Sequence, residues 1–575
     1  MKAGKDKIAQ ESGGNKAVSH PGEGMLREFS NLSGQDILDR ISSRDQPEQL
    51  IRQMPGEDFF WLIKRVGQDD CLPLLELASE EQWQYLLDLE VWNKDRLDLA
   101  QASDWLGRLQ QADPGRLGRW LLGEGQALSY YYLFRSIELE IRDDETSDIR
   151  DGFMTQDGVF YVRVRDSRLS EMIQNILKTM AGEDLNKYHS LLLGLGGLVP
   201  AEAEESLYRM RGARLAEHGF LPFEEALSVY APLDPDSLNL EKPSGYDAPI
   251  HEDDPDMGLV PVSPLYHAGG GNLLTETTAR ITDGPFLDRI RLEFAGLCNQ
   301  VISADGVLLH EIEVLVTACR KTSGYLGLAF ERLCGPDLDS IEKLLKNNSL
   351  LSIFRVGYGL AQAVKWDAVR WVEQSWFHGL GLDHGFWGDS RGETLAGLLE
   401  KRPRFFTGFR EGEEYRDFER LSELDHCRDL LYSLAAIDAL LERLSELYPM
   451  DKGMLQDPTL TFQPLLFDLW ARQQLNLEPC FSGISSGQAR ELFRHLRAGD
   501  GSSPFQMHGF REVFMNDLMA YASDLDPEAF THLRNALSGV WQEFRKEYER
   551  VSEKDLDRRF ARFIRITAPE PAVQK

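Results

Sequence analysis

The sequence predicts a mainly α-helical protein of several domains, with short-helix repeats near its N-terminus and one small β-hairpin element. The chain has 575 residues, more than a single hydrophobic core normally serves. Apolar residues recur at helical spacing over most of its length. The composition, 42% hydrophobic and 27% charged, is that of an ordinary globular protein rather than a disordered or membrane-embedded one. Several helical domains are therefore expected.

A repeat with an offset of 24 residues lies over residues 50–87. Phe59 of the first copy corresponds to Trp83 of the second. Each copy has the pattern of two short helices, and the second helix opens on acidic side chains, which the backbone dipole favours at a helix N-terminus. One such unit cannot bury its apolar face alone, whereas stacked units can. We therefore expect a helical repeat domain, a short superhelix, over residues 25–130.

This region resembles the N-terminal helical domain of bacterial magnesium transporters of the MgtE type. The resemblance rests on leucine spacing and on acidic residues at helix starts, such as Glu57-Asp58 and Glu80-Glu81. It implies stacked helices. The chain contains no segment like the transporters' membrane domain, so transport is not implied.

A β-hairpin is predicted inside a mixed domain over residues 131–232. Asp157-Gly158 lies between the segments Phe153–Thr155 and Val159–Val164, which are rich in β-branched and aromatic residues. Asp-Gly in that setting is a strong signal for a tight turn between strands. The preceding stretch Ser136–Arg142 alternates polar and apolar residues. We expect a small antiparallel element that connects helical parts.

The remaining segments are separated by composition. Residues 1–24 are polar and Gly-rich, which predicts a disordered tail rather than a signal peptide. Residues 233–272 are predicted to be an acidic Pro- and Gly-rich linker, because 233–256 alone hold eight acidic residues and four prolines. A helical domain is expected over 273–455 and a C-terminal helical region over 456–575.

Charge and cysteine content limit the partners and the compartment. The net charge of −31 repels a phosphate backbone, so nucleic-acid binding is not expected. None of the six cysteines forms a CxxC pair, which favours reduced thiols over a disulfide framework. The longest apolar run, residues 191–199, is far shorter than the ~20 residues of a membrane helix. We expect a cytoplasmic protein without a transmembrane segment.

The most suggestive local chemistry is a Gly-rich stretch after a long predicted helix. It places His378, Asp383, His384 and Asp389 within twelve positions. Two imidazoles and two carboxylates on one loop can hold a divalent metal or serve as general acid and base. Their spacing matches no standard zinc motif. In the alternative interpretation, the glycines turn the chain and its aromatic residues pack the loop down.

Two shorter motifs resemble known sites. Ala304-Asp305-Gly306 between helices resembles tellurite-resistance TerB-like domains, in which acidic residues can bind a metal. The alternative is a corner in which Asp305 caps the second helix. Gly483–Gly487 matches the G-x-S-x-G elbow of esterases, but no buried strand precedes it. The alternative is a loop whose serine caps the next helix.

These patterns are consistent with two functions. The first is a non-enzymatic helical scaffold or regulatory protein that binds a protein partner. The second is a metal-dependent enzyme or metal sensor that uses the loop from His378 to Asp389. The chain as a whole resembles uncharacterised bacterial families of large helical proteins of unknown function, through the segments Phe153–Arg163, Phe220–Tyr230 and Leu297–Glu313. That resemblance implies no activity. No cofactor is expected apart from the divalent metal of the second function, and the sequence identifies no small-molecule ligand.

Overall fold

A computed structural model describes residues 24–567, apart from 26–27, 30–31, 142–150, 198, 239–259, 308, 310, 409–411, 498–503, 506, 508, 553–554, 558 and 560. The predicted tail and most of the predicted linker therefore lie outside the described residues. The chain divides into two compact units, Met1–Gly357 and Tyr358–Lys575. The boundary falls inside one helix, α19 (Leu350–Gln374). The finer division into six segments stays a prediction.

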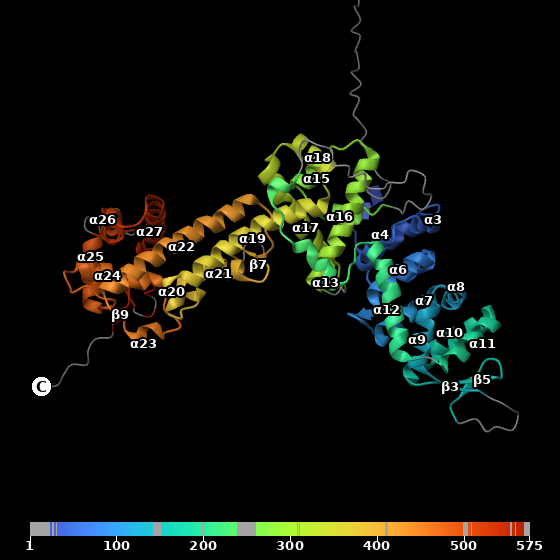
Figure 1. Cartoon of the computed structure of the whole chain (residues 1–575). Coiled ribbons are helices and arrows are strands. Elements are labelled where there is room, and N and C mark those ends of the chain that lie inside the picture. The colour runs from blue at the N-terminus through green and yellow to red at the C-terminus, as the bar shows by residue number, and fades with distance from the viewer. Residues whose placement is uncertain are drawn as a thin grey trace, which may run out of the picture. The chain divides into compact units, whose positions relative to one another are not determined.

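Helices make up most of the described residues, which confirms the predicted fold class (Figure 1). The helices of the first unit are α2 (Gly34–Ser42), α3 (Pro47–Arg52), α4 (Gly56–Val66), α5 (Leu72–Leu77), α6 (Glu80–Glu90), α7 (Leu99–Ala112), α8 (Pro114–Leu121), α9 (Gln126–Ser136), α10 (Ser170–Glu183), α11 (Leu185–Leu195), α12 (Pro200–Glu217), α13 (Phe223–Ala226), α14 (Ser263–Tyr266), α15 (Leu273–Thr278), α16 (Gly284–Asp305), α17 (Ile312–Cys334) and α18 (Leu338–Asn347). Its 3₁₀ turns are η1 (Ser167–Leu169), η2 (Leu227–Tyr230) and η3 (Pro235–Ser237).

The helices α4 and α6 occupy the repeat region. Each has 11 residues, and their first residues, Gly56 and Glu80, are separated by the predicted offset. Ser79 and Gln82 form a capping box that opens α6. Phe59 and Trp83, the corresponding aromatic residues, are both fully buried. Packing of α4 on α6 and of α3 on α5 buries the apolar face that each short helix presents.

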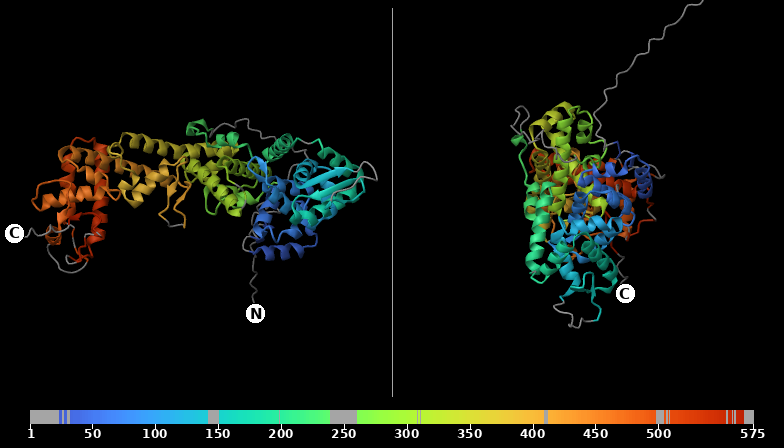
Figure 2. Two further views of the ribbon diagram at one scale, coloured as in Figure 1. Left: turned by 90° about the horizontal axis from the view of Figure 1, so that it is seen from below. Right: turned by 90° about the vertical axis from the view of Figure 1, so that its right-hand side faces the viewer.

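The predicted β element is present. Strands β3 (Ile137–Ile141), β5 (Phe160–Val164) and β4 (Met154–Thr155) form an antiparallel sheet in that spatial order, at the periphery of the first unit (Figures 1 and 2). In the turn before β5, an Asp157 carboxylate oxygen accepts hydrogen bonds from the backbone N–H groups of Val159 and Phe160, each at 2.9 Å. Gly158 takes a φ of +73°, which glycine adopts easily. A two-residue pair, β1 (Trp92–Asn93) and β2 (Arg96–Leu97), forms a second hairpin after α6.

The described end of the predicted linker is packed rather than extended. Val262 and Ser263 are buried, and their backbone N–H groups donate to the carboxylate of Asp58 in α4 at 3.0 and 2.8 Å. This carboxylate satisfies N–H groups that α14 leaves without helical partners. The linker's composition signalled loops, but Asp58 lies over 200 residues away in sequence, beyond the reach of a local pattern.

The second unit is also helical. Its helices are α20 (Trp376–Gly379), α21 (Asp389–Leu399), α22 (Leu421–Leu447), α23 (Lys452–Leu455), α24 (Phe462–Gln474), α25 (Ser486–Leu496), α26 (Gly509–Met519) and α27 (Pro527–Tyr548), with 3₁₀ turns η4 (His384–Trp387) and η5 (Ala520–Ala522). Its strands are β6 (Phe405–Phe406), β7 (Tyr415–Arg416), β8 (Ile484–Ser485) and β9 (Ile566–Thr567).

The C-terminal segment differs from expectation. Helical spacing predicts a helix over Lys554–Ile566, but the described residues there are not helical, and Ile566 pairs instead with Ile484 in a parallel bridge. Tertiary contacts override the local pattern: the backbone and side chain of Arg565 donate to the fully buried carboxylate of Asp468 at 2.9 and 2.6 Å.

A membrane span requires a helix of sufficient length and hydrophobicity. None of the described helices meets both requirements.

Candidate binding pocket

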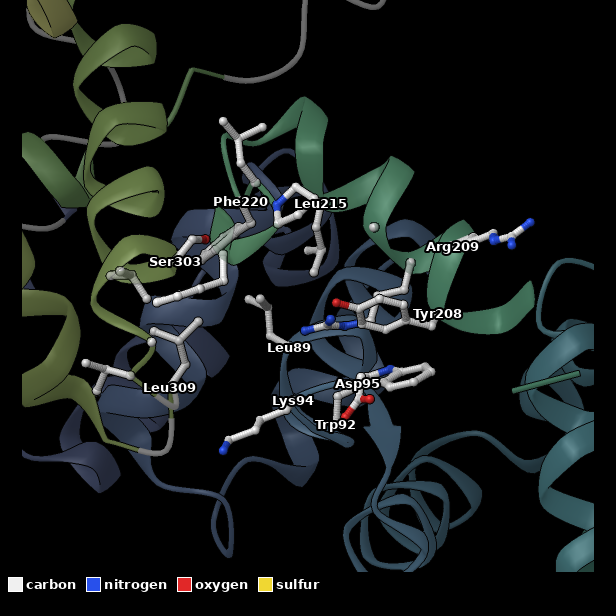
Figure 3. A pocket seen from close by; sticks show the side chains of 18 residues that line it. Leu89, Trp92, Lys94, Asp95, Tyr208, Arg209, Leu215, Phe220, Ser303 and Leu309 are labelled. Atoms are coloured by element: carbon white, nitrogen blue, oxygen red, sulfur yellow. The ribbon is translucent and has the colours of Figure 1, made fainter. Parts of the chain in front are cut away.

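A pocket of about 840 Å³ opens in the first unit, between the end of α6, the β1–β2 hairpin, α12, the segment that leads into α13, and the end of α16 (Figure 3). Its lining residues are Leu89, Trp92, Lys94, Asp95, Tyr208, Arg209, Arg211, Gly212, Leu215, Phe220, Leu221, Pro222, Phe223, Ile302, Ser303, Gly306, Val307 and Leu309. The volume lies within the range of pockets that hold a drug-sized molecule or several side chains of a peptide.

The walls of the pocket are mainly apolar. Leu89, Leu215 and Ile302 line it from three different helices and are otherwise buried. At its mouth, Phe223 is 51% exposed and Val307 is 47% exposed. Large apolar side chains left this exposed beside a pocket mark a surface that gains stability when it is covered.

Two arginines of α12 fix that helix against the end of α6. Nε and Nη2 of Arg214 donate to the two carboxylate oxygens of Asp88 at 2.6 and 2.8 Å. One turn earlier, Nε of Arg211 donates to the backbone carbonyl of the same Asp88 at 2.6 Å. Asp88 is buried, whereas the side chain of Arg214 is partly exposed. The two interactions hold one wall of the pocket in place.

Arg211 lies among aromatic rings inside this arrangement. Its guanidinium carbon is 5.3 Å from the centre of the Trp92 ring and 5.9 Å from that of Tyr208, distances typical of cation–π contacts. The two rings are tilted by 55° with centres 5.8 Å apart. Burial lowers the pKa of Arg211, and the nearby charge of Asp88 acts in the opposite direction. Arginine nonetheless stays protonated in proteins.

The loop after α12 is held close to α16. Gly219 has a φ of +86°, and a Cβ atom there would lie 2.5 Å from the carbonyl oxygen of Gly296. Only glycine permits this approach. Beside it, Nδ1 of His218 lies 2.5 Å from a carboxylate oxygen of Glu57, and the side-chain amide of Asn299 donates to the His218 carbonyl at 2.8 Å. These contacts place Phe220 and the residues after it along the pocket.

Charged side chains occupy the outer part of the pocket. Lys94 and Asp95 are exposed in the β1–β2 turn, where Lys94 adopts a φ of +59°. Arg209 forms an ion pair with Glu205 one turn away on α12, and its side chain points away from Trp92 and Tyr208 (Figure 3). The polar groups nearest the aromatic wall are thus Arg211 and the hairpin residues.

The four predicted metal-binding residues lie in the second unit. His378, Asp383, His384 and Asp389 are all exposed. A carboxylate oxygen of Asp383 accepts a hydrogen bond from the backbone of Gly385 at 2.8 Å and so begins η4. Within the described part of the chain, no group of three or more His, Cys, Asp or Glu side chains is arranged to hold a metal ion. The metal site stays a prediction.

Contacts of that loop agree with the alternative interpretation, in which glycines turn the chain and aromatic residues pack it down. Phe386 and Trp387 are buried, and their rings pack at 5.1 Å between centres. Gly381 and Gly388 adopt φ values of +76° and +81°, as chain-turning glycines do. Asp389 alone of the four candidates lines a pocket of about 870 Å³ in the second unit, which also contains Lys546 and Arg562.

The two shorter motifs have structural roles. The sequence suggested that Asp305 caps the following helix, but the structure shows that it does not. It is the last residue of α16, Gly306 ends that helix with a φ of +65°, and the Asp305 carboxylate accepts from Tyr230 at 2.7 Å and from Lys321 at 3.1 Å. Ser485 caps α25 by accepting from the backbone of Gln488. The serine of the esterase-like elbow thus has the capping role of the alternative interpretation.

Sequence reasoning did not single out the pocket. Trp92 and Arg211 are 119 positions apart, and nothing local signals that their side chains meet. One available signal was Pro222, which directly precedes α13 and lines the pocket. Another was the pair of glycines, Gly212 and Gly219, near the end of a helix that otherwise consists of good helix formers.

Comparison with protein families gives a match over most of the chain. The model of a family described as "Family of unknown function (DUF6178)" matches residues 16–567. No curated protein and no solved structure matches the chain. The expectation of an uncharacterised family is confirmed. The resemblance of residues 25–130 to magnesium transporters stays a prediction.

Proposed function

The chain belongs to the DUF6178 family of unknown function, and we propose that it is a non-enzymatic scaffold or regulatory protein that binds a protein partner through the pocket of its first unit. The single observation that carries this proposal is the combination of a mainly apolar pocket with the exposed side chains Phe223 and Val307 at its mouth. Burial of apolar surface is the main favourable term in most protein association.

A segment of a folded or unfolded partner fits the chemistry of the pocket. Trp92 and Tyr208 offer aromatic surface, and aromatic residues are enriched among the residues that dominate binding energy. The volume of about 840 Å³ exceeds what one side chain fills, so two or three neighbouring apolar side chains of the partner would enter together. Exposed Phe223 and Val307 would be covered by the same segment.

The lining residues support binding rather than catalysis. Among the lining residues that the structure describes, Ser303 has the one serine or threonine hydroxyl, and no histidine, cysteine or glutamate accompanies it. A serine nucleophile needs a base within hydrogen-bonding distance. The one carboxylate of this described lining, that of Asp95, belongs to the exposed hairpin turn. This composition favours a pocket that holds a ligand without transforming it.

Gly212 provides a way to block the pocket without disturbing its walls. It lies on α12, lines the cavity, and a Cβ atom built there meets nothing within 4 Å. Gly212→Trp would therefore fill the pocket from a well-tolerated position. Gly182 in α10 is a matched control, because it is exposed, lies outside the pocket, and has equally open surroundings.

The test compares tagged wild-type protein, Gly212→Trp and Gly182→Trp in affinity capture from the native host. We expect a stoichiometric partner with the wild type and the Gly182 variant but not with Gly212→Trp. The purified partner should then bind purified wild-type protein in calorimetry, with the same sensitivity to the two variants. Equal binding of the partner to all three proteins would refute the use of this pocket.

A further inference from the structure

Arg211, which lies among the aromatic rings of the pocket, has N–H donors that do not bind a carboxylate of the described residues. Its Nε donates to the Asp88 carbonyl, and the Asp88 carboxylate is engaged by both donor atoms of Arg214. Among the described residues, no ion pair joins Arg211 to an Asp or Glu side chain. A guanidinium carries five N–H donors in a fixed fork, so its two Nη groups remain to bind an anion.

We propose that Arg211 forms an anion-binding subsite of the pocket, which takes a carboxylate next to an apolar side chain of the partner. This inference rests on the function proposed above. The apolar side chain of the partner packs between Leu89, Leu215 and Phe223. The adjoining carboxylate accepts hydrogen bonds from the Nη groups of Arg211. The carboxylate belongs either to an Asp or Glu of the partner or to its C-terminal residue.

Charge complementarity selects an anion over a cation or a neutral group. Among the described lining residues, Arg211 and Lys94 form no ion pair, and Asp95 carries the one carboxylate, in a chain whose net charge is −31. A local positive group in an acidic protein attracts an anionic ligand to this pocket and away from the rest of the surface. The Trp92 and Tyr208 rings restrict access of water to the guanidinium, which strengthens its hydrogen bonds to an anion.

A monovalent carboxylate fits better than a phosphate group. Phosphate sites in proteins combine several cations or a row of backbone N–H groups, because the charge approaches −2. The pocket brings one arginine to the aromatic wall, and its surroundings are apolar. One guanidinium neutralises one carboxylate and can bind both of its oxygens at once.

The test uses two fluorescent probes that differ only in charge, dansyl-L-phenylalanine and dansyl-L-phenylalaninamide. Both present an apolar side chain, but only the first carries a carboxylate. We measure their affinities for full-length wild type, Arg211→Met, Arg211→Lys, Gly212→Trp and Arg119→Met. Arg119 is a control because it lies on α8, outside the pocket, in an exposed ion pair with Glu183.

We expect wild type and Arg119→Met to prefer the acid over the amide by about tenfold, the usual contribution of one charge-assisted hydrogen-bonded pair. Arg211→Met should remove that preference, so that the acid and the amide bind this variant with equal affinity. Arg211→Lys retains the positive charge and should therefore retain part of the preference for the acid over the amide. Gly212→Trp should abolish binding of both probes.

Two results would overturn the inference in distinguishable ways. If Arg211→Met and Arg211→Lys lower the affinities for acid and amide equally, Arg211 acts only by holding the wall, and the anion subsite is wrong while the pocket remains a binding site. If Gly212→Trp leaves both affinities unchanged, neither probe occupies the pocket, and the proposed function fails together with the subsite.

Discussion

Asp88 and Arg214 form a bidentate ion pair that joins the end of α6 to α12, with donor–acceptor distances of 2.6 and 2.8 Å. The two residues are 126 positions apart, so this pair closes a long stretch of chain onto the repeat region. The neighbouring Arg211 donates to the backbone carbonyl of the same Asp88 and lines the pocket. The pocket thus depends on an ion pair outside its lining.

Removal of the Arg214 guanidinium should destabilise the first unit. Arg214→Met leaves the buried Asp88 carboxylate without its two charge-assisted hydrogen bonds. We expect the free energy of unfolding to fall by about 1.5–2 kcal/mol. This is the lower part of the range for such bonds, because Arg214 is partly exposed. The measurement is urea unfolding of the full chain. Arg209→Met on the same helix removes only an exposed pair with Glu205 and should change this free energy by less than about 0.5 kcal/mol. Equal effects of both variants would contradict the structural role of Asp88.

Two glycines near the end of α12 should respond in opposite ways to alanine. Gly212 is inside the helix with open space around it, so Gly212→Ala should stabilise the protein by about 0.5–1 kcal/mol. Gly219 has a positive φ and faces the Gly296 backbone, so Gly219→Ala should destabilise it by about 1–3 kcal/mol. Thermal unfolding of both variants gives the signs directly. Shifts of the same sign would show that the backbone around Gly219 differs from the one described.

The ion pair of His218 and Glu57 predicts a pH dependence. Burial lowers the pKa of His218, but the hydrogen bond and charge of Glu57 outweigh it, with smaller contributions from Glu217 and Asp88, and the net pKa is raised. A base that holds its proton more tightly when folded stabilises the fold fully below the unfolded pKa, about 6.5. That stabilisation is lost as the pH rises through the higher folded pKa.

The variant His218→Gln isolates this contribution. We expect the difference in free energy of unfolding between wild type and His218→Gln to be largest near pH 5.5 and to shrink toward pH 8.5. Denaturation of both proteins in urea at a series of pH values provides the measurement. A difference that stays constant or grows with pH would show that His218 is not charged in the folded protein at low pH.

The metal hypothesis gives a separate expectation. His378 and His384 are exposed, and Asp383 uses a carboxylate oxygen to begin η4. Because the described loop gathers no set of three ligands, we expect elemental analysis of purified protein to find no stoichiometric metal. Addition of Zn²⁺ or Mn²⁺ should not change the thermal stability. A bound metal that disappears in the double variant His378→Ala/His384→Ala would establish the site.

The parts of the fold that local patterns determine could be predicted from the sequence. The hairpin before β5 depends on Asp157 and Gly158, whose turn is made by hydrogen bonds within three residues. Helix α6 begins at Glu80-Glu81, the acidic start that the repeat predicted, and its capping box is made by Ser79 and Gln82. In both cases the residues that form the turn or begin the helix lie inside the element or next to it.

Parts that depend on distant residues could not be predicted. The residues near Arg565 have helical spacing, but the buried Asp468, 97 positions earlier, binds that segment in an extended form. The pocket likewise combines Trp92 from a two-residue strand with Arg211 from a helix. Short motifs with glycine, histidine and carboxylates drew attention to the His378 loop instead, because their chemistry is visible in a local window.

The most direct test of the account is site-specific photo-cross-linking from the mouth of the pocket. A benzoylphenylalanine replaces Phe223 in the full chain, and Phe530, which is 37% exposed in the second unit, serves as the control position. Irradiation in the native host should give one defined cross-link from position 223, to an apolar partner segment that contains or ends in a carboxylate. That cross-link should disappear when Gly212→Trp is added. A cross-link at position 223 that persists with the pocket filled, or cross-linking from position 530 alone, would contradict the claim that this pocket binds the partner.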